Sequence, residues 1–99
     1  MSEPKQEPAG PVAKHVRVHG RVQGVFFRAS CVDQARQAGV HGWVRNEPDG
    51  TVRAHLEGET AAVERLVRWC HEGPAHAEVS SVESQGAAVA GFEGFEQRG

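Results

Sequence analysis

Residues 14–28 read Lys14-His15-Val16-Arg17-Val18-His19-Gly20-Arg21-Val22-Gln23-Gly24-Val25-Phe26-Phe27-Arg28, and their pattern predicts a strand, a turn and the start of a helix. Val16 and Val18 alternate with polar residues, and this period of two predicts a half-buried strand over residues 14–19. Gly20 and Gly24 bracket a short turn, and a helical pattern begins near Phe27. Such a turn lets successive N–H groups converge on an anion, and the helix N-terminus adds partial positive charge.

Arg28 lies at the mouth of this predicted anion cradle, where a planar guanidinium can grip two oxygens of a phosphate. The alternative interpretation is an ordinary strand-to-helix turn with one solvated arginine. The spacing matches neither a Walker loop nor a dinucleotide fingerprint, so phosphate binding is a hypothesis that the rest of the chain must support.

The composition limits the classes of function. Ninety-nine residues make one domain, and a net charge of −2 argues against broad binding to nucleic acid or anionic membranes. No apolar run is long enough to span a bilayer, and the N-terminus has no secretory signal. The two cysteines, Cys31 and Cys70, are far apart in sequence, which indicates reduced thiols in the cytoplasm. We expect a cytoplasmic monomer.

Two regions precede the central hairpin. Residues 1–13 carry three of the five prolines and few bulky apolar groups, so we predict a disordered tail, followed by one domain over 14–99. The helix after the glycine turn should span 27–38 and end at Gly39. Its apolar face comprises Phe27, Cys31, Val32, Ala35 and Ala38.

A hairpin is predicted over residues 40–57, with its turn at Asn46-Glu47-Pro48-Asp49-Gly50. In the second arm Val52, Ala54 and Leu56 should face inward, and Thr51, Arg53, His55 and Glu57 outward. In the first arm Val44 and Asn46 share one face, so that Asn46 lies at a strand end. Asparagine before a turn commonly bonds its own backbone, and this alternative stays open.

The remaining chain predicts one helix and up to two strands. A second helix should run from Gly58-Glu59-Thr60 to about His71, with a core stripe of Val63, Leu66, Val67 and Cys70. Residues 77–84 read as a weak strand; because Val79 and Val82 are three apart, it contains a bulge or its assigned alternation is shifted by one residue. Residues 85–94 should loop, and residues 95–98 can add a short edge strand.

The element order is therefore β-α-β-β-α-β with a short fifth strand at the end. This order predicts the α+β, ferredoxin-like split βαβ sandwich, an antiparallel sheet with two helices on one face. Many unrelated functions use this fold, so function must come from the site.

Several side chains admit a second interpretation. Six histidines suggest a metal site, but their spacing lacks tight pairs, so we expect solvated surface positions and no metal. Glu47 and Asp49 could pair as carboxylates, although turn chemistry explains both. Cys31 and Cys70 can meet between the helices, and free thiols are favoured. Trp43 is most simply a packing residue, or else it covers the site.

Two stretches together resemble the acylphosphatase family, small hydrolases that split carboxylic–phosphoric anhydrides. Gly20-Arg21-Val22-Gln23-Gly24-Val25-Phe26-Phe27-Arg28 is similar to the phosphate loop and arginine of that family. Gly42-Trp43-Val44-Arg45-Asn46-Glu47-Pro48-Asp49-Gly50-Thr51-Val52 is similar to the segment that holds its catalytic asparagine. The resemblance covers about residues 14–98.

The resemblance implies a role for each residue of the site. Arg28 would bind the phosphoryl oxygens, and Asn46 would orient the attacking water. Backbone N–H groups of Gln23, Gly24, Val25, Phe26 and Phe27 would cradle the same phosphate. The substrate would be a small acyl phosphate, and inorganic phosphate would be product and inhibitor. The family uses no metal or other cofactor and forms no phosphoenzyme.

Two rival functions remain. The chain could be a non-catalytic phosphate-binding regulatory module on the same fold. It could also be an RNA-binding domain, which would need exposed aromatic residues and a basic sheet face. The negative charge and the absence of tyrosine disfavour the latter.

Overall fold

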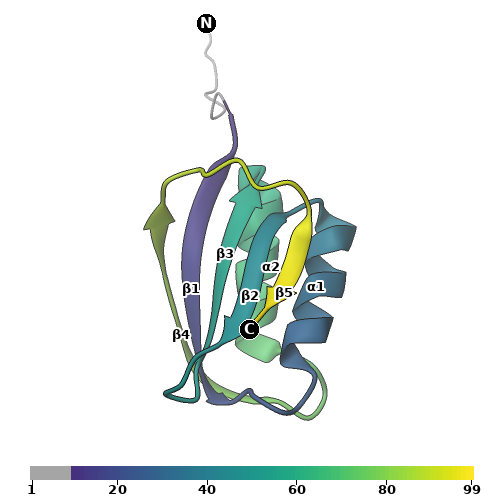
Figure 1. Cartoon of the computed structure of the whole chain (residues 1–99), viewed down its shortest axis with the longest axis vertical. Coiled ribbons are helices and arrows are strands. Elements are labelled where there is room, and N and C mark those ends of the chain that lie inside the picture. Colours follow the sequence, from purple (N-terminus) through teal and green to yellow (C-terminus); the bar gives the residue numbers. More distant parts are fainter. Residues whose placement is uncertain (1–9) are drawn as a thin grey trace, which may run out of the picture.

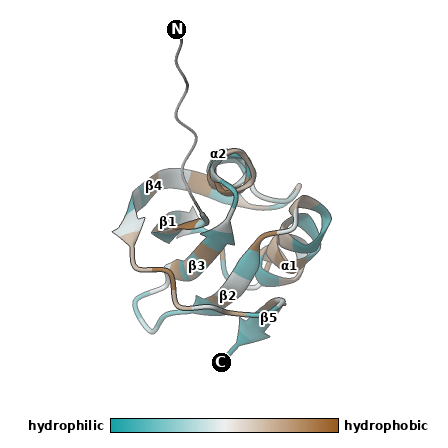
Figure 2. Cartoon of the chain, turned by 90° about the horizontal axis from the view of Figure 1, so that it is seen from above, coloured by the Kyte–Doolittle hydropathy of each residue, from teal (hydrophilic) through white to brown (hydrophobic). Residues whose placement is uncertain are grey.

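The computed structural model describes residues 10–99 and has two helices packed on one face of a five-stranded sheet (Figures 1 and 2). In chain order the elements are β1 (Val12–Arg21), α1 (Phe27–Ala38), β2 (His41–Asn46), β3 (Val52–Gly58), α2 (Thr60–Glu72), β4 (Glu78–Ala87) and β5 (Phe95–Arg98). The predicted α+β, ferredoxin-like sandwich is confirmed. Within this part of the chain, neither helix is long and apolar enough to cross a membrane.

The strand order is β4-β1-β3-β2-β5. The four longer strands pair antiparallel, as predicted, whereas β5 pairs parallel to β2 and makes the sheet mixed. The prediction of a short fifth strand over 95–98 is confirmed, and its parallel pairing brings the C-terminal residues alongside the strand that carries Asn46.

The first boundary differs from the prediction. β1 begins at Val12, so residues 12 and 13 belong to the sheet, with Val12 opposite Gly58 and Ala13 opposite Glu57. Most of the predicted disordered tail, residues 1–9, lies outside the described residues.

The core fills the space between the helices and the sheet. Val16, Val18, Val44, Val52 and Leu56 are almost completely buried. The helices contribute the residues that their periodicity predicts, and Gly39 ends α1 in the left-handed conformation with φ 75°. Because Asn46 pairs with Val52 and is two residues from Val44, it lies on this helix-facing side of the sheet.

Cys31 and Cys70 meet where α1 contacts α2, and both are buried free thiols. A hydrogen bond with Cys70 and burial together raise the pKa of Cys31 well above its ordinary value. A thiol held protonated in this way is a weak nucleophile, so Cys31 acts as a small core residue.

β4 is longer than predicted. It continues to Ala87, so Gln85 and Gly86 pair with β1 instead of looping. The expected bulge is present: Ser81 pairs with His19 and Val79 with Gly20, which leaves Ser80 as the extra residue.

The outer face of the sheet is more covered than the alternation indicates. Thr51, His55 and Glu57 were predicted to face solvent, but all three are buried, and His55 is only 3% exposed. The residues after β4 cross this face, and Phe92 packs edge-on against the His55 ring with centroids 5.2 Å apart. The prediction that all six histidines are solvated is therefore wrong for His55.

Candidate active site

The candidate site lies at the end of the molecule where α1 begins and β2 and β5 end (Figure 1). A pocket of about 260 Å³ is found there, and it contains both Arg28 and Asn46. Its walls are Val22, Gly24, Phe26, Phe27, Arg28, Ala29, Asn46 and Gln97. Two residues predicted from separate sequence segments thus border one small cavity.

The conformation of the loop before α1 leaves several of its main-chain N–H groups without a main-chain acceptor in the described part of the chain. Gly24 has φ 74° and Phe26 has φ 65°, so the chain curls twice through the left-handed region. Among residues 10–99, no main-chain acceptor is found for the N–H groups of residues 23–27. The first intrahelical bond is donated by Ser30 to the carbonyl of Phe26.

No side chain of the first turn of α1 neutralises the partial positive charge of the helix N-terminus. Phe26, the N-cap residue, makes no side-chain capping bond, and the first turn contains no acidic residue. The first amides of a helix lack internal partners and carry partial positive charge, which favours an anion. The pocket therefore combines these amides with the guanidinium of Arg28.

Arg28 is half-buried, and a hydrogen bond to the C-terminal strand, β5, holds its side chain in place. Its Nη1 donates to the main-chain carbonyl of Arg98 at 3.3 Å. The Arg98 guanidinium stacks over the rings of Trp43 and Phe92, at 5.3 and 5.4 Å from their centroids. Trp43 packs on the outer face and does not line the pocket, which agrees with its interpretation as a packing residue.

Asn46 ends β2 and borders the pocket. Its Oδ1 is buried and has no hydrogen-bond partner among the described residues. A buried acceptor without a partner costs about 1–3 kcal/mol, so native structures seldom keep one without a purpose. The expected alternative, a bond from Asn46 to its own backbone, does not occupy this oxygen.

The turn after Asn46 is held by Asp49, not by a carboxylate pair. The Asp49 carboxylate accepts from the Thr51 hydroxyl at 2.7 Å and from the Thr51 N–H at 2.9 Å. These bonds lower the pKa of Asp49. Glu47 instead accepts from Nε of Arg45 at 2.6 Å, so turn chemistry and a half-buried ion pair account for both carboxylates.

The predicted cradle residues fall into two groups. Gly24, Phe26 and Phe27 line the pocket with Arg28, whereas Gln23 and Val25 do not. The Gln23 side chain donates from Nε2 to the carbonyls of Glu47 at 2.8 Å and Thr51 at 2.9 Å. This contact ties the loop to the hairpin that carries Asn46, and no local pattern in the sequence indicates it.

Gln97 lines the pocket, although no pattern in the sequence singles it out. It reaches the pocket because β5 pairs with β2 in the register that sets Gln97 opposite Val44. Only the register of a long-range strand pair could have identified it.

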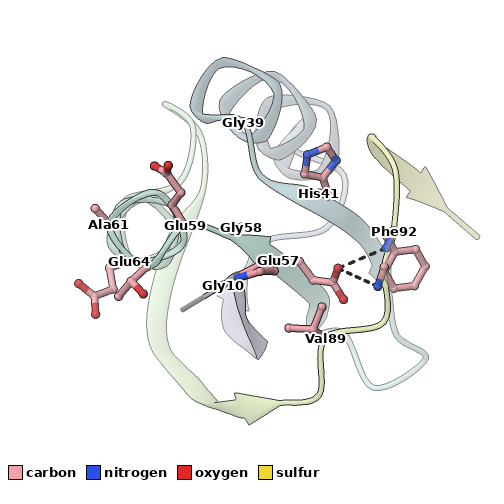
Figure 3. Close-up of a pocket in the computed structure, with 13 residues that line it drawn as sticks. Gly10, Gly39, His41, Glu57, Gly58, Glu59, Ala61, Glu64, Val89 and Phe92 are labelled. Carbon is pink, nitrogen blue, oxygen red and sulfur yellow. Dashed lines mark hydrogen bonds between the residues drawn. The ribbon is translucent and has the colours of Figure 1, made fainter. Parts of the chain in front are cut away.

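A larger cavity, about 1010 Å³, lies at the opposite end of the sheet (Figure 3). Its lining includes three carboxylates, of Glu57, Glu59 and Glu64, so it would repel a phosphate. The larger volume favours this cavity as a binding site, whereas the charge of its lining favours the smaller pocket. For an anionic substrate, the charge of the lining matters more than the volume. Within residues 10–99, no three His, Cys, Asp or Glu side chains are grouped to hold a metal ion.

Comparison with known proteins decides the family. The family described as acylphosphatase matches residues 14–97, which is most of the chain. The chain belongs to the acylphosphatase family. An acylphosphatase of Rubrobacter xylanophilus is 59% identical over 88 residues, covering 86% of this chain and 80% of that protein. One of an Acidovorax species is 49% identical, covering 93% and 95%.

Solved acylphosphatase structures have the same fold. The acylphosphatase from Coxiella burnetii superposes with a TM-score of 0.87 at 37% identity, covering 90% of this chain and 94% of that one. The expected resemblance is confirmed, and the chain is an enzyme of the acylphosphatase class.

Proposed function

We propose that this acylphosphatase hydrolyses the carboxyl–phosphate bond of small acyl phosphates by direct, in-line attack of water on phosphorus. In this mechanism Arg28 and the amides of the 23–27 loop hold the phosphoryl oxygens, and Asn46 orients the water. The observation that carries the proposal is that Asn46 borders the same pocket as Arg28, while its buried Oδ1 has no hydrogen-bond partner among the described residues.

Because an acyl phosphate is already reactive, its hydrolysis needs only this small set of catalytic groups. The leaving group is a carboxylate, whose conjugate acid has a pKa of about 4, so it departs without a general acid. What remains is to hold three equatorial oxygens and to position the nucleophile. Fixed positive potential from a guanidinium and main-chain amides meets the first requirement.

The neutral amide of Asn46 suits the second requirement. It cannot take a proton from water as a base does, but Oδ1 accepts a hydrogen bond and so directs a lone pair of the water toward phosphorus. As the new O–P bond forms, the bond to the acyl oxygen breaks and its electron pair leaves with the carboxylate. The protons of the water pass to phosphate oxygens and solvent.

Labelled water tests the mechanism directly. Hydrolysis of acetyl phosphate in H₂¹⁸O should put the label in inorganic phosphate and none in acetate, with an equal rate in the presence of chelator. No ³²P should remain on the quenched protein when the substrate is labelled. Label in acetate, loss of activity with chelator, or a labelled protein would each refute the corresponding step.

We further infer that the protein acts in the cytoplasm as a monomer, with inorganic phosphate as product and competing ligand. The two buried free thiols fit a reducing compartment. A net charge of −2 gives little attraction to nucleic acid or to anionic lipid. Sedimentation at micromolar concentration should give the mass of one chain.

A further inference from the structure

Phe26 combines two unfavourable features at one position. Its side chain is 78% exposed, the most of any large apolar residue among residues 10–99. It is also the one residue other than glycine with positive φ in that range, at φ 65° and ψ 21°. For a bulky side chain this backbone conformation is a genuine outlier, and such outliers gather at functional sites.

Phe26 lies beside the proposed reaction centre. Phe26 lines the pocket of Arg28 and Asn46, and it also lines an adjoining cavity of about 380 Å³. Gly24 and Phe26 are the two residues that both cavities share. Apolar groups of Val25, Ala75 and Ala77 border the adjoining cavity.

The geometry of in-line attack determines the direction in which the acyl group leaves phosphorus. Water enters from Asn46, so the acyl oxygen must leave on the opposite side of phosphorus. With the phosphoryl group against Arg28 and the loop, the acyl chain is directed away from Asn46. Phe26 borders both this pocket and the adjoining cavity, so an acyl chain that extends from one to the other would pass its apolar ring.

We propose that Phe26 is a specificity-determining residue whose ring packs against the acyl group and favours aromatic or apolar acyl phosphates. This inference rests on the proposed function, because it assumes the phosphoryl group at Arg28. The charged groups around the adjoining cavity, Arg21 and Glu78, have opposite signs and give no strong preference for a charged acyl chain.

The test compares two substrates across variants. The measured quantity is kcat/KM for benzoyl phosphate divided by kcat/KM for acetyl phosphate. Phe26→Asn removes the ring, and asparagine tolerates the left-handed conformation. The ratio should fall about fivefold to tenfold, which is the range expected for one lost aromatic contact. Phe26→Tyr should keep the ratio within about twofold, since a ring is retained.

Val89→Asn is the matched control. Val89 is 45% exposed and lines the cavity at the opposite end of the sheet, so its loss removes apolar surface without touching the site. The ratio should not change in this variant. If both substrates lose the same factor in Phe26→Asn, so that the ratio is unchanged, the inference is overturned. Should that variant not fold, Phe26→Gly gives the same comparison.

Binding of stable analogues separates this inference from the proposed function. Benzoylphosphonate and acetylphosphonate carry the same acyl groups on a P–C bond that water does not cleave. If the parent protein hydrolysed neither phosphate, the proposed function would fail. The ratio of phosphonate affinities would then decide the inference, and it should fall in Phe26→Asn and not in Val89→Asn.

Discussion

Gln23 is hydrogen-bonded to Glu47 beside the site, with Nε2 of the glutamine 2.8 Å from the main-chain carbonyl oxygen. The same nitrogen donates to the carbonyl of Thr51 at 2.9 Å. One side chain thereby fixes the loop before α1 to both sides of the turn that follows Asn46. The position of the loop proposed to hold the phosphate, relative to the amide proposed to orient the water, depends on this link.

Replacing Gln23 should therefore impair turnover more than phosphate binding. Gln23→Ala removes two hydrogen bonds, so we expect a loss of about 1–2 kcal/mol in the free energy of unfolding. The value of kcat should fall about tenfold, because a small misplacement of catalytic groups is costly. The inhibition constant for inorganic phosphate should rise by a smaller factor.

Gln23→Glu provides the isosteric comparison. It keeps the shape but sets a carboxylate against two carbonyl oxygens, so it should reduce kcat at least as much as alanine does. Gln37→Ala, which removes an exposed amide from α1, is the control and should change neither quantity. A Gln23→Ala protein that is less stable but turns over at the parent rate would limit Gln23 to a structural role.

Asn46→Ala should abolish most turnover while leaving phosphate inhibition nearly intact. The substitution removes the unpartnered Oδ1 but none of the groups proposed to hold the phosphoryl oxygens. By analogy with the loss of one oxyanion donor, we expect kcat to fall at least about 10²-fold. Steady-state kinetics with acetyl phosphate, with inorganic phosphate as competitor, measures both effects. Parent-like kcat would remove Asn46 from the mechanism.

Arg28→Lys should weaken phosphate inhibition at least about tenfold, since lysine keeps the charge but loses the planar fork. It also loses the geometry with which Nη1 reaches the carbonyl of Arg98. Arg36→Lys is a close control, because Arg36 lies on the same helix and donates to the β5 carbonyl of Phe95 at 3.2 Å, outside the pocket. Equal inhibition of the Arg28→Lys variant and the parent would mean that phosphate binds elsewhere.

Local patterns were sufficient for most of the fold. The apolar face of α1 and the glycine after it predicted Phe27–Ala38, and the Pro48-Asp49-Gly50 turn predicted the hairpin that ends β2 at Asn46. The glycine- and alanine-rich composition of residues 85–94 predicts that the strand ends at residue 84, whereas β4 continues to Ala87. Pairing with β1 along its whole length outweighs that composition, and pairing partners are not visible in the strand itself.

Contacts between distant segments account for what the sequence did not predict. Alternation predicted outward, solvated positions for His55 and Glu57, but the segment after β4 covers them. The side-chain bonds of Gln23 and the place of Gln97 likewise depend on pairings across the whole sheet. Arg28 and Asn46 each lie in a long, ordered motif, which is why the sequence singles them out, and the structure places both at one pocket.

Glu57 should make the stability of the protein depend on pH in the acid range. Its carboxylate is 3% exposed and accepts from Nε2 of His55 at 2.7 Å, and from the N–H groups of Ala90, Gly91 and Phe92. Two of the main-chain bonds are drawn in Figure 3. Burial alone would raise the pKa of Glu57, but these hydrogen bonds outweigh it and lower the pKa below its ordinary value.

Proton linkage determines whether the stabilisation from Glu57 grows or falls as the pH is lowered. Between the lowered pKa of the folded state and the ordinary value of about 4.3, the unfolded chain binds more protons than the folded one. The stabilisation from Glu57 is therefore complete above about pH 5, and it is lost as the pH falls through the folded-state pKa. Glu57→Gln, which cannot ionise, should be less stable at pH 7 by about 1–3 kcal/mol and should lose less stability on acidification.

Urea unfolding of the parent and of Glu57→Gln between pH 3 and pH 7 measures this difference. The gap in the free energy of unfolding should be widest above about pH 5 and should narrow toward pH 3. Glu64→Gln is the control, because Glu64 is an exposed carboxylate of α2 near the same cavity, and it should leave the pH profile unchanged. A gap for Glu57→Gln that stayed constant across this range would mean that the carboxylate stabilises the loop by shape and not by its charge.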